Sequence, residues 1–138
     1  MIVIDSNVLS ELMRPTQNAT VVAWMRTLAP SEATTTAVTT AEIGYGLGRL
    51  PEGKRRRHLI QVFETLLSDI SPDVLPFDAA AAESYPQIAL TREASGRPID
   101  PLDCMIAAIC RSRGAFLATR NERDFDDTGV EVINPWTN

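Results

Sequence analysis

Along the chain, short runs of β-branched and apolar residues alternate with longer stretches in which apolar residues recur every three or four positions. The run Ile2-Val3-Ile4 is typical of a buried strand and ends on Asp5. The next stretch predicts a helix that Ser6 caps and Pro15 ends, because its apolar residues share one helical face: Val8, Leu9, Leu12 and Met13. The chain therefore opens with a strand followed directly by an amphipathic helix.

The same periodicities place further elements along the rest of the chain. Helices are predicted at about 21–28, from a Thr39-x-x-Glu42 capping box to Leu50, across 59–67, from Asp78 to about Ala94, and from Asp100 to near Gly114. Strands are predicted at 33–38, 74–75, 115–119 and 130–133. This alternation predicts a three-layer α/β domain with a short, mainly parallel central sheet flanked by helices. We expect residues 1–138 to form one domain, since this length suits a single core.

Composition and charge narrow the classes of function. With 44% hydrophobic and 22% charged residues, the chain has the usage of an ordinary globular protein. No apolar run reaches the roughly 18 residues of a bilayer span and no signal peptide precedes the first strand, so we expect a cytoplasmic protein without membrane contact. The formal net charge of -5 argues against nucleic-acid binding through a bulk positive field, although it permits a local basic patch.

Chemistry based on sulfur or imidazole is poorly supported. Cys104 and Cys110, the two cysteines, lie six positions apart on one predicted helix, which places them on different faces and forbids a disulfide. His58 is the single histidine and lies beside a basic run. Catalytic triads that use histidine as the base, and zinc sites rich in cysteine or histidine, are therefore not expected.

Carboxylates are instead abundant, and four of them map to one edge of the predicted sheet. Asp5 closes the first strand, and Asp124 follows a late one. Glu42 and Asp103 lie in the first turns of predicted helices, whose amino ends share that ligand-binding edge. Gathered carboxylates repel one another unless a cation lies among them, and oxygen ligands alone favour Mg²⁺ or Mn²⁺. The pattern indicates metal-assisted phosphoryl transfer, with Asn7 placed to orient Asp5.

Three of these acids also have a purely structural interpretation. Glu42 could complete the capping box that Thr39 begins, and Asp103 could occupy the same position behind Asp100. Asp124 equally suits a solvated surface acid. Both interpretations stay open for these three residues.

Several motifs follow one another in an order that is specific, even though each one is weak alone. They are Ile4-Asp5-Ser6-Asn7-Val8-Leu9-Ser10-Glu11, Thr40-Ala-Glu42-Ile-Gly-Tyr-Gly-Leu47, Arg49-Leu-Pro-Glu-Gly53, Asp103-Cys-Met-Ile-Ala-Ala108, Ala118-Thr-Arg-Asn-Glu-Arg-Asp-Phe125 and Asn134-Pro-Trp136. In this order the chain resembles PIN-domain ribonucleases of the VapC toxin type, close to the FitB-like branch. The resemblance spans essentially the whole chain.

The resemblance implies Asp5, Glu42 and Asp103 as catalytic acids, with Asp5 and Asp103 as the expected metal ligands. The family's fourth acidic position falls in the segment that ends at Asn121, which is neutral here. Asp124, three residues later, is therefore the better candidate for the fourth catalytic acid. Residues expected to support the site are Asn7, Thr119 and Asn121.

The resemblance also implies a function: a Mg²⁺- or Mn²⁺-dependent endoribonuclease that cleaves single-stranded or structured RNA. Such a protein acts as a toxin that a cognate antitoxin neutralises, and it forms a homodimer, for which the apolar tail at Trp136 is a candidate contact. Candidate RNA phosphate contacts are Arg120 and Arg123 beside the site and Arg55 in the basic run 54–57. A solvated helix face or surface ion pairs would equally explain these arginines.

Two other functions remain open. An aspartate-based phosphotransfer domain also uses an aspartate after a buried strand, but a haloacid-type phosphatase needs a second aspartate where this chain has Asn7. A receiver domain needs a lysine after a late strand, yet Lys54 is the only lysine. A non-catalytic PIN-like domain that binds RNA or protein would lack several of the acids, so their presence favours catalysis.

Overall fold

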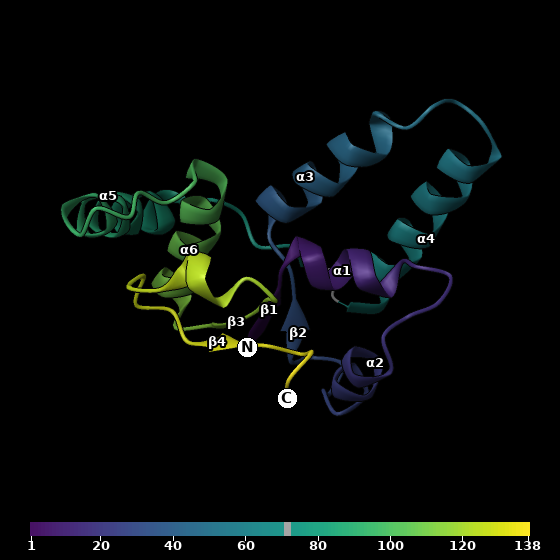
Figure 1. The fold of residues 1–138 in the computed structure, drawn as a ribbon, viewed down its shortest axis with the longest axis horizontal. Helices are drawn as coiled ribbons and strands as arrows, with labels where there is room; N and C mark the ends of the chain where they lie inside the picture. The colour runs from purple at the N-terminus through teal and green to yellow at the C-terminus, as the bar shows by residue number, and fades with distance from the viewer. Residues whose placement is uncertain (71–72) are drawn as a thin grey trace.

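The computed structural model describes residues 1–70 and 73–138. Within these residues, four parallel strands form a sheet in the order β2-β1-β3-β4 (Figure 1). The strands are β1 (Ile2–Ile4), β2 (Ala33–Thr34), β3 (Phe116–Ala118) and β4 (Val132–Ile133). The helices are α1 (Ser6–Leu12), α2 (Ala19–Arg26), α3 (Ala37–Gly48), α4 (Lys54–Ile70), α5 (Ala79–Ala94) and α6 (Pro101–Arg113), and a 3-10 helix, η1 (Glu122–Phe125), follows β3.

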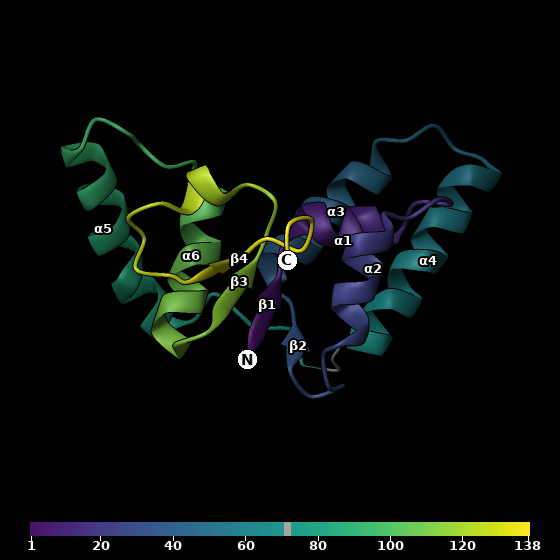
Figure 2. The same cartoon turned by 60° about the horizontal axis from the view of Figure 1, so that its bottom comes forward.

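The sheet separates two groups of helices, because successive side chains of a strand point to opposite faces. Val3 and Leu117 belong to a core that α5 and α6 complete. Ile4 and Ala118, the next residues of the same strands, belong to a second core with α1, α2, α3 and α4. Figure 2 shows the two helical groups on either side of the strands. The prediction of a three-layer α/β fold with a parallel sheet is therefore confirmed.

The register of the sheet sets two polar residues side by side. Ile4 pairs with Ala118, and the Asp5 amide donates to the Ala118 carbonyl oxygen at 3.0 Å. Asp5 and Thr119, the residues after these strand ends, therefore lie together at the carboxyl edge of the sheet. Ligands bind at this edge in parallel α/β folds.

Two helix caps differ from the sequence-based prediction. Asp5, rather than Ser6, caps α1, since its Oδ1 accepts a hydrogen bond from the Ser6 amide at 2.8 Å. Thr36, rather than Thr39, caps α3, and its Oγ1 accepts from the Thr39 amide at 3.0 Å. The predicted Thr39-x-x-Glu42 capping box is therefore wrong, and Glu42 lies in the second turn of α3 instead of the first.

Other boundaries move by a few residues. α2 begins two residues earlier than predicted because the Asn18 side chain caps it. The predicted strand at 33–38 is only two residues long, since the chain turns into α3 directly afterwards. At 74–75 the structure has one parallel bridge, between Leu75 and Thr36, in place of a strand. The late strands are shorter than the predicted ranges 115–119 and 130–133.

The two cysteines lie on one helix, as the sequence predicts. Cys104 and Cys110 are both free and buried in α6. Burial raises the pKa of these thiols to about 11 and about 12, so neither is a reactive thiolate at neutral pH. Over the described part of the chain, no helix combines the length and the apolar character that crossing a membrane requires.

Candidate active site

Asp5 makes the most hydrogen bonds of the four predicted acids, and it is only 3% exposed. Its Oδ1 accepts from the Ser6 amide at 2.8 Å, while its Oδ2 accepts from the Thr119 hydroxyl at 2.7 Å and from Asn7 Nδ2 at 3.3 Å. Burial raises the pKa of Asp5, and these three hydrogen bonds oppose the rise. The fold thus holds a carboxylate in one orientation at the end of β1.

Thr119, which follows the neighbouring strand β3, and Asn7, in α1, hold Asp5 in place. The Thr119 hydroxyl donates to Asp5 and accepts from Asn7 Nδ2 at 3.0 Å and from the Asn121 amide at 3.1 Å, which uses its full hydrogen-bonding capacity. Asn7 Oδ1 in turn accepts from the Arg120 amide at 3.0 Å. The structure therefore brings Asn7 and Thr119 together with Asp5, whereas Asn121 contributes its backbone amide.

Asp103 reaches the same edge from the first turn of α6. Asp100 caps this helix, because its Oδ1 accepts from the amides of Leu102 and Asp103 at 2.9 and 3.4 Å. Pro101 occupies the first helical position, so both predictions about the start of this helix are confirmed. The Asp103 carboxyl is half-buried and takes no part in the cap. The two aspartates thus have different roles despite lying three residues apart.

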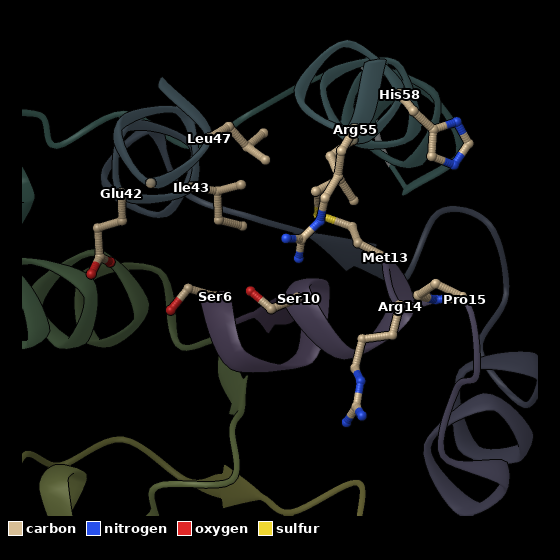
Figure 3. Close-up of a pocket in the computed structure, with 12 residues that line it drawn as sticks. Ser6, Ser10, Met13, Arg14, Pro15, Glu42, Ile43, Leu47, Arg55 and His58 are labelled. Carbon is tan, nitrogen blue, oxygen red and sulfur yellow. The ribbon is translucent and has the colours of Figure 1, made fainter. Parts of the chain in front are cut away.

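Glu42, on α3, lies at one end of a cavity that residues of α1, α3 and α4 line (Figure 3). Its Oε1 is buried and has no hydrogen-bond partner among the described residues. Burial raises the pKa of Glu42, and the charges of Asp5 and Asp100 raise it further. A buried oxygen without a partner costs free energy, so a cation or a hydrogen-bond donor bound at this atom would stabilise the site.

Asp124 lies in η1 and is exposed. Its amide donates to the Asn121 carbonyl oxygen at 3.1 Å, which closes the 3-10 turn. The side chain of Asn121 makes no capping hydrogen bond there. The charge of Asp124 contributes to the raised pKa of Asp5 and of Asp103, so η1 brings this acid within electrostatic range of both.

The pKa of Asp103 rises from its ordinary value of 3.8 to about 7. Burial is the main cause, followed by the charges of Asp5, Asp100, Asp124 and Glu42. None of the salt bridges in the described residues joins any of these acids to a lysine or arginine. The negative charge of the site is therefore uncompensated by the protein, and a bound cation would relieve it.

The donor atoms of the site fit a hard divalent cation. They are carboxylate oxygens, which suit Mg²⁺ and Mn²⁺ better than zinc, and Glu42 Oε1 has no hydrogen-bond partner among the described residues. In the described ranges, no three Asp, Glu, His or Cys side chains gather closely enough to form a complete metal cage. Mg²⁺ does not need such a cage, because it usually keeps several waters and binds one or two carboxylates.

Arg92 is a residue of this region that the sequence patterns miss. It is 6% exposed on α5, and its Nη1 donates to the carbonyl oxygens of Asp124 and Asp126, both at 2.9 Å. Its Nε donates to the Arg97 carbonyl oxygen at 2.7 Å. A buried guanidinium thus ties α5 to η1 and fixes the backbone at Asp124. Local periodicity could not reveal this contact, since Asp124 lies 32 positions further along the chain.

We expect Arg92→Met to lower the free energy of unfolding by more than about 2 kcal/mol, because three carbonyl oxygens lose their donor. Arg92→Lys is the matched control: it keeps the charge but lacks the planar fork, so it should restore part of the loss. Chemical denaturation of the three proteins measures the effect. An Arg92→Met protein as stable as wild type would contradict the proposed positioning role.

The three arginines predicted to contact phosphate lie in different places. The Arg120 guanidinium lies over the ring of Trp136, 5.0 Å from its centroid. Trp136 itself is half-buried against the core that α1 to α4 form rather than exposed, and a dimer contact there stays a prediction. Arg123 is exposed in η1, and Arg55 points from the start of α4 into the cavity (Figure 3).

Comparison with known proteins agrees with this geometry. The PIN domain family matches residues 2–131. The chain belongs to the PIN-domain family. VapC ribonuclease Y4jK of Sinorhizobium fredii is 36% identical over 137 residues, which cover 99% of this PIN domain and 98% of the relative. Toxin FitB of Neisseria gonorrhoeae is also 36% identical over 137 residues, 99% of each chain.

Solved structures show the same fold. The crystal structure of FitAcB from Neisseria gonorrhoeae has a TM-score of 0.91 at 36% identity, and the match covers 99% of each chain. VapBC-5 from Mycobacterium tuberculosis, a member of the VapBC family of toxin-antitoxin systems, has a TM-score of 0.73 at 25% identity and covers 96% of each chain. The resemblance of this PIN domain to VapC-type and FitB-like proteins is therefore confirmed.

Proposed function

We propose that this PIN domain is an endoribonuclease that depends on Mg²⁺ or Mn²⁺. The observation that carries the proposal is that the charges of Asp5, Glu42 and Asp124 all raise the pKa of Asp103, while no salt bridge of the described residues neutralises these acids. The unpartnered oxygen of Glu42 supports a ligand at this place. RNA as the substrate is supported by the relative that is named a VapC ribonuclease.

In the proposed mechanism, Asp5 and Asp103 would hold the metal, and Glu42 and Asp124 would complete the acidic site. A bound Mg²⁺ or Mn²⁺ would lower the pKa of a coordinated water and offset the charge of the phosphodiester. The hydrogen bonds from Thr119, Asn7 and the Ser6 amide favour the ionised form of Asp5, against the effect of burial, and orient its carboxylate before substrate arrives. Catalysis then requires little reorganisation of the protein.

We also propose that this PIN domain is the toxin of a toxin-antitoxin pair that acts on single-stranded or structured RNA in the cytoplasm. Its likeness to Toxin FitB and to a member of the VapBC family of toxin-antitoxin systems supports a cognate antitoxin as partner. We expect it to form a homodimer, with the part of Trp136 that the Arg120 guanidinium and the protein core leave accessible as a candidate contact.

The proposed activity can be tested with a 5′-labelled single strand made as RNA and as DNA of the same sequence. With Mg²⁺ or Mn²⁺ present, we expect the purified protein to release internal RNA fragments and to leave the DNA intact, since the 2′-hydroxyl distinguishes the two. Gel electrophoresis of a time course resolves the products. Equal cleavage of DNA, release of terminal nucleotides alone, or an intact RNA would each contradict the proposal.

A further inference from the structure

A cavity of about 560 Å³ lies between α1, α3 and α4, directly beside the acids (Figure 3). Its size is within the range of about 300–1,000 Å³ that small-molecule pockets have. Ser6 and Glu42 are part of its wall. Because the Ser6 amide binds the Asp5 carboxylate and Glu42 belongs to the acidic site, the cavity and the site share one wall. If the bond to be cleaved in a polymer lies at the acids, the neighbouring unit of the polymer reaches this cavity.

The lining combines an apolar surface with donors and positive charge. The apolar part includes the side chains of Met13, Ile43, Leu47 and Leu59. Ser10 contributes a hydroxyl, and Arg55 and His58 contribute a guanidinium and an imidazole from α4. Figure 3 shows Ser10 and Arg55 directed into the same space. Unpaired bases stack on arginine and histidine planes, and their backbone phosphates bind arginine, so this combination suits a nucleotide.

Arg55 has no acidic partner to occupy it. The salt bridges of the described residues leave it unpaired, whereas Arg14, at the outer end of the same cavity, pairs with Glu11 at 3.4 Å. Arg55 also lies in the first turn of α4, where a positive side chain is unfavourable because that helix end already carries partial positive charge. A phosphate bound here would offset both charges.

We propose that this cavity receives the nucleotide adjacent to the cleaved phosphodiester of a single-stranded RNA, with Arg55 on its backbone phosphate. The inference rests on the proposed ribonuclease function and adds to it the position of a flanking nucleotide. An apolar peptide would match the aliphatic wall but would leave the guanidinium of Arg55 without an anion. The charges therefore favour RNA over a peptide as the occupant.

The test compares Arg55→Ala with Arg57→Ala, using the full chain. Both variants remove one exposed arginine from the same turn of α4, but only Arg55 lines the cavity. For a short single-stranded RNA, Arg55→Ala should raise KM about tenfold with little change in kcat. This is the expected effect of losing a contact that binds the substrate but does not touch the cleaved bond. Arg57→Ala should leave both constants near those of wild type.

Salt dependence supplies a second readout that does not need cleavage. The slope of a plot of log Kd against log salt concentration should decrease by about 0.7 in Arg55→Ala, the value for one phosphate contact on a single strand. The slope should not change in Arg57→Ala.

Equal effects of both variants would show a diffuse basic patch and would overturn the inference. So would an unchanged KM in Arg55→Ala together with weaker binding of the cognate antitoxin, because the cavity would then receive protein. A wild type that binds RNA in this way but cuts none would instead count against the proposed function.

Discussion

Asp103→Asn is expected to lower the rate of RNA cleavage by at least about a hundredfold while the protein stays folded. Asparagine keeps the shape of the side chain but cannot carry the negative charge that a divalent cation needs. A hundredfold loss corresponds to about 2.7 kcal/mol of transition-state stabilisation, which is typical when one preorganised electrostatic contact is removed. Cleavage rates at saturating Mn²⁺ measure the effect.

The same substitution should not destabilise the metal-free protein. In the folded state the pKa of Asp103 is about 7, against an ordinary value of 3.8. Between these pH values the folded protein keeps a proton that the unfolded chain releases, so the free energy of unfolding should fall as pH rises from about 4 to about 7. Asp103→Asn removes this titration. Its metal-free stability at pH 7 should therefore equal or exceed that of wild type.

Asp100→Ala is the matched control, because it removes a carboxylate from the same helix start. Asp100 caps α6 through two backbone amides, so its loss should lower the free energy of unfolding by about 0.5–2 kcal/mol. Cleavage should stay close to wild type. Thermal melts without metal, together with cleavage rates, separate the two roles. A stable but inactive Asp100→Ala protein would mean that the roles of the two aspartates are reversed.

Removing divalent metal is expected to abolish RNA cleavage altogether. EDTA should reduce the rate to background, and added Mn²⁺ should restore it. Ca²⁺ should not restore cleavage, because its longer and more flexible coordination positions a water poorly.

Stability gives a readout of metal binding that is independent of cleavage. Mn²⁺ at a hundred times its Kd should stabilise wild type by about 2.7 kcal/mol. Asp5→Asn should lose most of this gain, although asparagine caps α1 as well as aspartate does. Cleavage that persists in EDTA, or equal stabilisation of Asp5→Asn by Mn²⁺, would be incompatible with a metal at this site.

Much of the architecture follows from local sequence patterns. The parallel sheet is predictable because Ile2-Val3-Ile4 and the later apolar runs alternate with amphipathic helices. The start of α6 is predictable because Asp100-Pro101 combines a capping side chain with a proline that fits the first turn. The start of α3 is not, since Thr36 and Thr39 are equally good caps, and the short length of β2 decides between them.

The arrangement of the acids could be predicted only in part. Asp5 and Asp103 are identifiable because each sits at the end of an element that the sequence predicts well. The position of Asp124 depends on Arg92, which belongs to a different helix and contacts only backbone oxygens there. The local pattern of apolar and polar residues cannot predict such a contact. The cavity at Arg55 is likewise formed by three helices from separate segments of the chain.

The central claim is that a divalent cation binds among these acids. Crystals grown with saturating Mn²⁺ test it most directly, because the anomalous scattering of manganese locates the ion without reference to activity. We predict an anomalous peak between the carboxylates of Asp5 and Asp103. Manganese peaks at other sites only, with both carboxylates ordered and free of metal, would contradict this account.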